Sequence, residues 1–513
     1  MQSDIILLVL DTQRADHLSC YGYGHSTSKA LDALAAEATR FAAATAPAQW
    51  TVPTHASLFT GLYPSQHTMH QMNAVLPREL PTLAQRLSAA GYFTAGFSQN
   101  PLIGLVKNEL DRGFQRFESF HLLSNILLTT RLNRPDAPLS IAKRAQRGVR
   151  WLLAESLGYS HETPLQRLAP LLAPVWQRLL QAQGRSKIAG TAALLDVAAR
   201  LLITREGCAP DQPIFVFMNL MGTHVPYDPD RRLLRRFLPD THKNRQVSDL
   251  LRWANQLQID VHNWLDRPLP AQEQALLNAI YDAEVATQDA HVGAFLGKLR
   301  DADRYDDTFL AVVADHGDHL GDKDRVNHAF GVYQALVNVP LIIRDPAQGL
   351  PPGQVRQDPV STRHLFHTLL TAAGAASPQE MALGLATNDP LNGGDRSTSA
   401  VFSEGFPLQW AIGRLQDEKA RLAETQGYTQ TVRAVRDGRH KLISGAGRPE
   451  LYDLVRDGLE SEDLQAQLPQ RLRDLEKELE GFLSWAMPVA GAQTQEEDDP
   501  QVLQQLRDLG YLD

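Results

Sequence analysis

Two apolar runs of strand length, far apart in the chain, constrain its fold more than any other feature. Ile5–Leu10 leads directly into Asp11, and Phe309–Ala314 leads directly into Asp315 and His316. A continuous apolar run of this length predicts a strand that is buried on both faces. Ligands of open α/β sheets bind in the crevice outside the carboxyl ends of such strands. The two runs therefore predict a polar site at that end of a central sheet.

Helical and strand-like segments alternate along much of the remaining chain. Apolar spacing predicts helices over Ser28–Phe41 and Pro81–Ala90, and strands over Phe93–Ser98 and Ile214–Leu220. Alternation of this kind is typical of an α/β sheet with helices packed on its faces.

The segment Trp50–Pro64 resembles the active-site signature of the sulfatase family, which belongs to the alkaline phosphatase superfamily. That signature has Cys or Ser, then x-Pro-Ser/Ala-Arg, then x-x-x-Thr-Gly, and Pro53, Thr60 and Gly61 match it in register. Thr51 stands where the family has the Cys or Ser that is oxidised to formylglycine. Because threonine carries an extra methyl group on Cβ, it cannot give that aldehyde, and no formylglycine is expected.

The threonine changes what the resemblance implies about the reaction. Threonine nucleophiles are familiar from phosphoryl-transferring relatives: lipoteichoic acid synthases, phosphoethanolamine transferases and nucleotide pyrophosphatase/phosphodiesterases. The implied function is a metal-dependent hydrolase or transferase that acts on phosphate diesters or phosphonate esters through a covalent Thr51 intermediate. Two alternatives remain open: a sulfatase that works without formylglycine, and a catalytically silent member that binds a phosphorylated ligand.

The same resemblance implies a metal site. The family's metal-ligand blocks match the two strand ends, so Asp11, Asp315 and His316 carry over as ligands, with the Thr51 oxygen bound to the same ion. Many sulfatases have a second acid where this chain has Thr12, and the resulting ligand set is similar to a site for one divalent ion. Mixed oxygen and imidazole ligands suit zinc or manganese better than calcium, but ligand type alone separates these ions weakly.

Further candidate site residues lie near the family's motif blocks. His224 begins a segment that resembles the family's His-x-Pro-x-x-Pro, where the histidine contacts substrate oxygens or helps the leaving group. His328 stands near a lysine of the family and is expected to act as a substrate-binding cation or a general acid. His55 replaces the motif arginine and either takes part in catalysis or holds the loop through a hydrogen bond. Asn73 and Asn100 are candidate substrate-binding residues.

Asp318 and His319 follow the second metal block directly. They could contact the metal-binding residues and hold them in place, but the favoured prediction is that they start a helix after the sheet. The segment Ala283–Leu299 matches the family's Asp-x-x-x-Gly helix before the last metal strand, through Asp289 and Gly293.

The resemblance implies an alkaline-phosphatase-like α/β fold, with a large mixed central sheet flanked by helices in residues 1–399. A smaller C-terminal α+β domain is expected over residues 400–513. Its expected parts are strands over Ala400–Glu404, Arg433–Ile443 and Glu450–Leu454, a hairpin turn at Asp437 and Gly438, and a helix over Leu468–Trp485.

Two segments do not resemble the family core: residues 122–202 and residues 240–276. Both have helical patterns and are predicted to be insertions, and the first is rich in Arg and Lys. The simplest reading of the first is a helical layer that packs on the core with a solvated basic face. The functional readings are a lid, an oligomer contact, or a surface that rests on anionic lipid.

Charge and the N-terminus limit the expected partners. A formal net charge of -9 argues against a general nucleic-acid binder. The expected substrate is a small-molecule or lipid-headgroup ester.

No basic region precedes Ile5–Leu10, and that run is too short for a signal core or a membrane span. The sequence therefore predicts a cytoplasmic enzyme.

Overall fold

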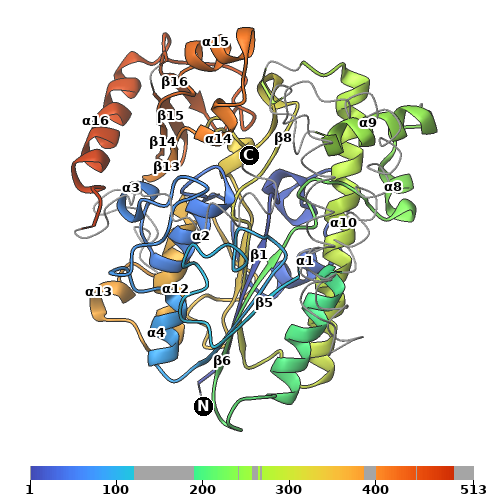
Figure 1. Cartoon of the computed structure of the whole chain (residues 1–513), viewed down its shortest axis with the longest axis vertical. Helices are drawn as coiled ribbons and strands as arrows, with labels where there is room; N and C mark the ends of the chain where they lie inside the picture. Colours follow the sequence, from blue (N-terminus) through green and yellow to red (C-terminus); the bar gives the residue numbers. More distant parts are fainter. Residues whose placement is uncertain are drawn as a thin grey trace, which may run out of the picture.

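The computed structural model describes residues 2–120, 190–240, 242–256, 264–265, 268–385, 400–445 and 447–489. Most of the insertion expected at 122–202, the domain boundary expected at 399 and the chain after 489 lie outside the described residues. In the described part, a large sheet lies between two layers of helices, and a smaller sheet sits above its carboxyl end (Figure 1). The predicted α/β fold class is confirmed.

The central sheet has eight strands in the order β11-β2-β10-β7-β1-β6-β4-β5. β1 (Asp4–Leu10) lies between β7 (Thr308–Val313) and β6 (Ile214–Leu220) and pairs with both in parallel. β10 (Leu341–Arg344) runs antiparallel to β7, so the sheet is mixed, as predicted. The buried strands β1, β6 and β7 are the continuous apolar runs of the sequence. The remaining strands are β2 (Thr39–Phe41), β4 (Phe93–Ser98), β5 (Arg116–Ser119) and β11 (Val355–Arg356).

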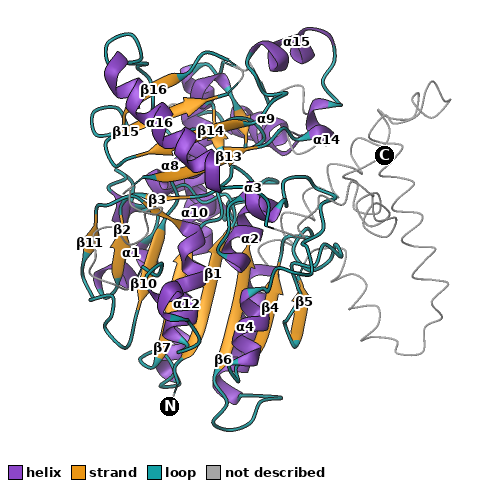
Figure 2. Cartoon of the chain, turned by 90° about the vertical axis from the view of Figure 1, so that its left-hand side faces the viewer, coloured by secondary structure: helices purple, strands orange, loops and turns teal. Residues whose placement is uncertain are grey.

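Helices cover both faces of this sheet (Figure 2). α10 (Ala271–Asp301) and α1 (Lys29–Ala36) contact each other on one face. α2 (Thr51–Thr60), α4 (Leu83–Ala89) and α12 (Leu365–Ala372) contact one another on the opposite face. Residues 190–204 are also helical. Within the described ranges, no helix combines the length and apolar character that a membrane span requires.

The shorter elements lie in the connections and in the C-terminal part. The helices are α3 (Pro64–His67), α8 (Arg231–Phe237), α9 (Asn244–Gln256), α11 (Gln334–Val337), α13 (Pro378–Met381), α14 (Gln409–Ile412) and α15 (Asp417–Thr425). The two-residue strands are β3 (Ala44–Thr45), β8 (His319–Leu320), β9 (Val326–Asn327) and β12 (Val360–Ser361). Single 3-10 turns span Ala15–His17, Ser19–Tyr21, Asp322–Asp324 and Thr362–His364.

The C-terminal sheet is antiparallel, in the order β13-β14-β15-β16, and α16 (Pro469–Trp485) packs on it. A second, smaller core joins the two, with Tyr63, Phe402 and Phe482 in contact at its centre. The predicted hairpin is present, because the Asp437 N–H donates to the His440 carbonyl at 3.1 Å. The four strands are β13 (Val401–Gly405), β14 (Val432–Arg436), β15 (His440–Ser444) and β16 (Glu450–Asp453).

Two predicted helical segments differ in the structure. The helix expected over Ser28–Phe41 ends at Ala36, and Thr39–Phe41 forms β2 instead because it pairs with β10. Within the predicted insertion 240–276, the described helical residues are α9 (Asn244–Gln256) and the start of α10 at Ala271, whereas residues 264–265 and 268–270 are not helical.

Gly61 ends the helix that begins at Thr51. Its φ of +73° lies in the left-handed region, and its N–H donates to the Ser57 carbonyl at 2.9 Å. A Cβ at this position would lie 2.9 Å from the Phe366 ring and 3.0 Å from His367 Nε2. The Thr-Gly of the motif is therefore a tightly packed C-cap that fixes α2 against α12.

Gly61→Ala is expected to lower the free energy of unfolding by about 2–4 kcal/mol, because backbone strain and overpacking add. Gly22→Ala is the matched control. Gly22 also has positive φ (+94°), but an added Cβ meets nothing within 4 Å. That variant should lose only about 1 kcal/mol. Denaturant unfolding measures both, and equal losses would contradict close packing at the end of α2.

Candidate active site

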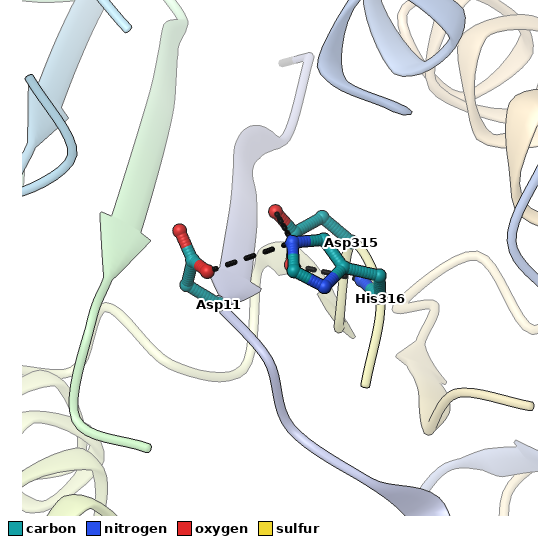
Figure 3. Close-up of side chains that lie close together, drawn as sticks. All are labelled: Asp11, Asp315 and His316. Atoms are coloured by element: carbon teal, nitrogen blue, oxygen red, sulfur yellow. Dashed lines mark hydrogen bonds and ion pairs between the residues drawn. The ribbon is translucent and has the colours of Figure 1, made fainter. Parts of the chain in front are cut away.

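Asp11 and Asp315 leave the sheet side by side. β1 and β7 pair in parallel with Val9 opposite Val313, and each aspartate lies two residues beyond its member of that pair. Both residues are completely buried. The two carboxylates predicted from separate apolar runs are therefore brought together at the carboxyl end of the sheet (Figure 3).

His316 completes this cluster. Its Nδ1 lies 2.8 Å from the Gly317 carbonyl oxygen, which assigns the ring proton to Nδ1 and leaves the lone pair of Nε2 free. That Nε2 lies 3.8 Å from Asp11 Oδ1 and 3.5 Å from Asp315 Oδ2 (Figure 3). Burial lowers the pKa of His316 to about 3, and the neighbouring His328 acts in the same direction. The ring is therefore neutral, which is the form that binds metals.

Thr51 points into the same cluster from the first turn of α2. Its Oγ1 lies 3.3 Å from His316 Nε2 and 3.4 Å from Asn100 Nδ2. Trp50 is extended and Thr51 is the first residue of α2, so the hydroxyl lies at the positive end of the helix dipole. Developing negative charge on the threonine oxygen would be stabilised there.

Asn100 connects the threonine to the first aspartate. Its amide Nδ2 donates to Asp11 Oδ2 at 2.8 Å, while its Oδ1 accepts from the Leu102 N–H at 2.9 Å. The second contact fixes which way the amide points. The structure thus places Asn100, predicted only from its nearness to the motif, in contact with both Asp11 and Thr51.

The cluster fits one divalent metal ion. Among the described residues, Asp11 Oδ1 and Asp315 Oδ2 are buried oxygens without a hydrogen-bond partner. Ligand atoms of Asp11, Asp315 and His316 all lie within 4.8 Å of one another. Two adjacent buried carboxylates beside a neutral imidazole need a cation to offset their charge. These three residues could hold it, with the Thr51 hydroxyl as a further oxygen donor.

Residues around the cluster hold its ligands in place. The Thr223 hydroxyl donates to the Asp11 carbonyl at 2.6 Å, and the Thr12 N–H donates to Asp315 Oδ1 at 3.3 Å. Thr12 has a φ of +57°, and its own carbonyl accepts from the Tyr281 hydroxyl on α10. Thr12, which replaces a second acid, therefore orients Asp315 through its backbone.

His224 and His328 lie beside the cluster. The ring centroids of His328 and His316 are 4.6 Å apart, and those of His328 and His224 are 5.2 Å apart. Both His224 and His328 are half-buried. Burial lowers the pKa of His328 to about 3, with His224 acting in the same direction, so His328 is neutral near pH 7. The two roles predicted for His328, substrate-binding cation and general acid, stay predictions.

Asp318 was assigned wrongly from the sequence. The residues after the motif form β8 (His319–Leu320) rather than a helix. Asp318 Oδ1 lies 3.4 Å from His328 Nδ1, and Oδ2 accepts from the Tyr227 hydroxyl at 3.4 Å. Burial raises the pKa of Asp318 to about 7. An acid directly after a metal-ligand block was the signal that could have identified this partner of His328.

His55 is completely buried in α2, and its Nδ1 lies 3.6 Å from Asp315 Oδ2, so it borders the cluster. Its Nδ1–H donates to the Thr51 carbonyl at 2.9 Å, and its Nε2 lies 3.3 Å from Asn219 Nδ2. The ring packs edge-on against Phe59 and Phe217. Burial lowers its pKa to about 4, so it is neutral. These contacts favour the second of the two predicted roles, in which His55 holds the nucleophile loop.

Asn73 lies in the segment that connects α3 to α4. It is half-buried in a turn. Its predicted contact with substrate stays a prediction.

In the metal-free protein, the contribution of Asp315 to stability is expected to fall as pH rises above about 4. Burial and the adjacent Asp11 raise the pKa of Asp315 well above its usual range in the folded state. The stabilising contribution of protonated Asp315 is therefore complete below its unfolded pKa and disappears as pH rises through its folded pKa. Each unit by which the folded pKa of Asp315 exceeds its unfolded pKa corresponds to about 1.4 kcal/mol of stability.

Melting temperatures of chelator-treated protein across this pH range measure the effect. Asp315→Asn should gain stability relative to the wild type as pH rises, and added divalent metal should raise the stability of the wild type near neutral pH. Identical metal-free profiles for the wild type and Asp315→Asn would contradict the assignment.

Comparisons with known proteins agree with this geometry. The Sulfatase family model matches residues 3–375. Steryl-sulfatase of Mus musculus is 26% identical over 431 residues, covering 77% of this chain and 66% of the mouse protein, just under two thirds of it.

Two solved structures share the fold. The phosphonate monoester hydrolase of Agrobacterium radiobacter has a TM-score of 0.61 at 21% identity, covering 95% of this chain and 96% of that one. A 2-O GAG sulfatase has a TM-score of 0.63 at 17% identity, covering 95% and 93% of the two chains. With the family match extending across most of the central sheet and both aspartate-bearing strands, the chain belongs to the sulfatase family of the alkaline phosphatase superfamily.

Proposed function

We propose that this sulfatase-family hydrolase acts on phosphate diesters or phosphonate esters, with Thr51 as the covalent nucleophile. The observation that carries the proposal is the position of Thr51 Oγ1, 3.3 Å from His316 Nε2 and 3.4 Å from Asn100 Nδ2, beside two buried aspartates. A hydroxyl needs activation at neutral pH. A divalent ion held by Asp11, Asp315 and His316 would lower the pKa of the hydroxyl and offset charge on the transferred group.

The reaction divides into two displacements at phosphorus. In the first, the Thr51 oxygen forms a bond to phosphorus while the bond to the leaving alcohol breaks. His224 would assist the departure of the leaving oxygen, with neutral His328 packed beside it and Asp318 orienting His328 through its Nδ1. In the second, water or an acceptor alcohol displaces Thr51. Most of the acceleration would come from positioning and charge stabilisation.

The chemistry of one metal site favours diesters and phosphonate esters over phosphate monoesters. Asp11 and Asp315 already offset the charge of a single divalent ion, so the site would hold less positive charge than a monoester dianion requires. The structural similarity to a phosphonate monoester hydrolase supports the same substrate class. In a hydrolase, the acceptor is water; in a transferase, it is an alcohol.

A sulfate ester hydrolase is the second candidate, and the similarity to steryl-sulfatase of Mus musculus favours it. Thr51 cannot be converted to formylglycine, but a sulfate ester could still bind at this site. A silent phospho-ligand binder is the third. The presence of all three metal-binding side chains and the Thr51 hydroxyl argues against that reading.

Substrate competition tests the proposal. Metal-loaded protein should turn over a p-nitrophenyl phosphodiester or a p-nitrophenyl phosphonate ester faster than p-nitrophenyl sulfate. Acceleration by glycerol or ethanolamine would identify a transferase. Faster turnover of the sulfate would overturn the proposal in favour of a sulfatase, and no turnover of any ester despite bound metal would favour the silent binder.

A further inference from the structure

α8 (Arg231–Phe237) is strongly basic on a protein with a net charge of -9. Residues 231–256, which include α8 and α9, hold seven Arg and Lys against two Asp and no Glu. The helix is well formed, because Asp230 caps it by accepting from the Arg232 and Leu233 N–H groups at 2.7 and 3.2 Å. All four arginines of α8 are exposed: Arg231, Arg232, Arg235 and Arg236.

These arginines are not neutralised within the described part of the protein. No described acid forms an ion pair with any of the four arginines of α8. The neighbouring α9 differs, because Arg245 and Arg252 both lie within ion-pair distance of Asp249, at 3.7 and 3.0 Å. Among the described residues, no acid therefore offsets the charge of α8.

The outward face of α8 combines cations with apolar side chains. Leu234 and Leu238 pack against the main core. At about 100° per residue, the direction opposite these two leucines is that of Arg236, flanked by Arg232 and Leu233. Leu233 is only half-buried. A free anionic molecule would need only the arginines, whereas a lipid surface uses both kinds of side chain.

Phe237 lies on the side of the helix, next to Leu233 in helical projection. It is half-buried, with the Arg236 guanidinium 5.4 Å from its ring centroid and His25 6.0 Å away. In lipid interfaces, cationic side chains reach headgroups while apolar neighbours enter the acyl boundary.

The helix lies at the outer margin of the molecule and is held firmly there. Figure 1 shows α8 at the right-hand edge, outside α10. The segment that leads to it from His224 is fixed to α10, because the Asp228 N–H donates to Glu284 at 2.6 Å and the Asp230 N–H donates to Thr287 at 3.3 Å. A surface that α8 contacts is thereby linked through a short, anchored segment to the candidate active site.

We propose that α8 docks the protein on a bilayer that contains anionic lipid. The negative surface potential attracts the four arginines, and Leu233 and Phe237 enter the headgroup region. This surface goes beyond the proposed function and does not depend on which ester Thr51 attacks. Docking concentrates the enzyme at a membrane, and its natural partner is the lipid surface itself.

Vesicle co-sedimentation of the full chain tests this proposal. The protein should bind vesicles of phosphatidylcholine mixed with phosphatidylglycerol, should bind phosphatidylcholine alone much more weakly, and should be released by high salt. Because each basic side chain contributes about fivefold, neutralising the four α8 arginines to Gln should weaken binding by at least about 100-fold. Leu233→Ser with Phe237→Ser should weaken it several-fold and leave the remaining binding more sensitive to salt.

A charge-matched control removes four exposed arginines from other elements. The control substitutes Gln at Arg78, Arg421, Arg456 and Arg473. It should retain most of the vesicle binding, and ester turnover of all variants in solution should equal that of the wild type. Loss of binding in the control as large as in the α8 variant would overturn the proposal. So would absence of wild-type binding to anionic vesicles, or tighter binding to a soluble sulfated polysaccharide than to those vesicles.

Discussion

Thr51→Ala is expected to lower kcat for the preferred ester by about 10⁴-fold or more, while the protein still binds metal. The alanine removes the only oxygen that α2 places beside His316, Asn100 and the two aspartates. Positioned histidines would remain, so substrate binding should change less than turnover. Steady-state kinetics together with metal analysis of the same preparation measures both quantities.

Two neighbouring substitutions sharpen this prediction. Thr51→Ser keeps the hydroxyl and should stay within about tenfold of the wild type. Thr54→Ala removes another buried hydroxyl from the same helix, one that donates to the Trp50 carbonyl at 2.8 Å rather than facing the cluster. It should also cost less than about tenfold. Comparable activity of Thr51→Ala and Thr54→Ala would exclude Thr51 as the nucleophile.

Asp315→Ala is expected to abolish metal binding and activity together. Asp315 supplies one of the two carboxylate oxygens of the cluster that lack a hydrogen-bond partner, and the other ligand atoms lie within 4.8 Å of it. With the wild type, metal at 100 times its Kd should stabilise the fold by about 2.7 kcal/mol. The variant should gain no such stabilisation, because its site lacks a ligand. Calorimetric unfolding with and without metal, and metal analysis after dialysis, check this result.

Asp318→Asn is the matched control for Asp315→Ala. Its carboxylate contacts His328 and the Tyr227 hydroxyl, so the variant should keep its metal and its metal-dependent stabilisation while turnover falls. An Asp315→Ala protein that retains one metal with unchanged affinity would place the ion elsewhere.

The strand ends of this site could be predicted from sequence because local pattern and topology agree there. Ile5–Leu10 and the run before Asp315 are apolar throughout, and parallel pairing of β1 with β7 brings their carboxyl ends together. Thr51 could be placed because it opens a helix within a spaced motif. Each of these residues is fixed mainly by the element that carries it.

Other parts depend on contacts that no local pattern contains. Thr39–Phe41 continues a helical pattern but becomes a strand because Thr39 pairs with Ile343 of β10. The local sequence around Asp318 predicts the start of a helix. In the structure, its carboxylate accepts a hydrogen bond from Tyr227, which is far away in the sequence. The sequence leaves His55 with two roles, in catalysis or in holding the loop, and the contact of its Nε2 with Asn219, far away in the sequence, favours the second. Tertiary partners override local propensity at each of these positions.

Peptide mass spectrometry after brief exposure of metal-loaded protein to a p-nitrophenyl phosphonate ester or phosphodiester tests the central claim most directly. The account predicts a phosphonyl or phosphoryl adduct on the Thr51 peptide, absent from Thr51→Ala. An adduct on any other residue, or a Thr51 adduct formed only from p-nitrophenyl sulfate, would contradict it.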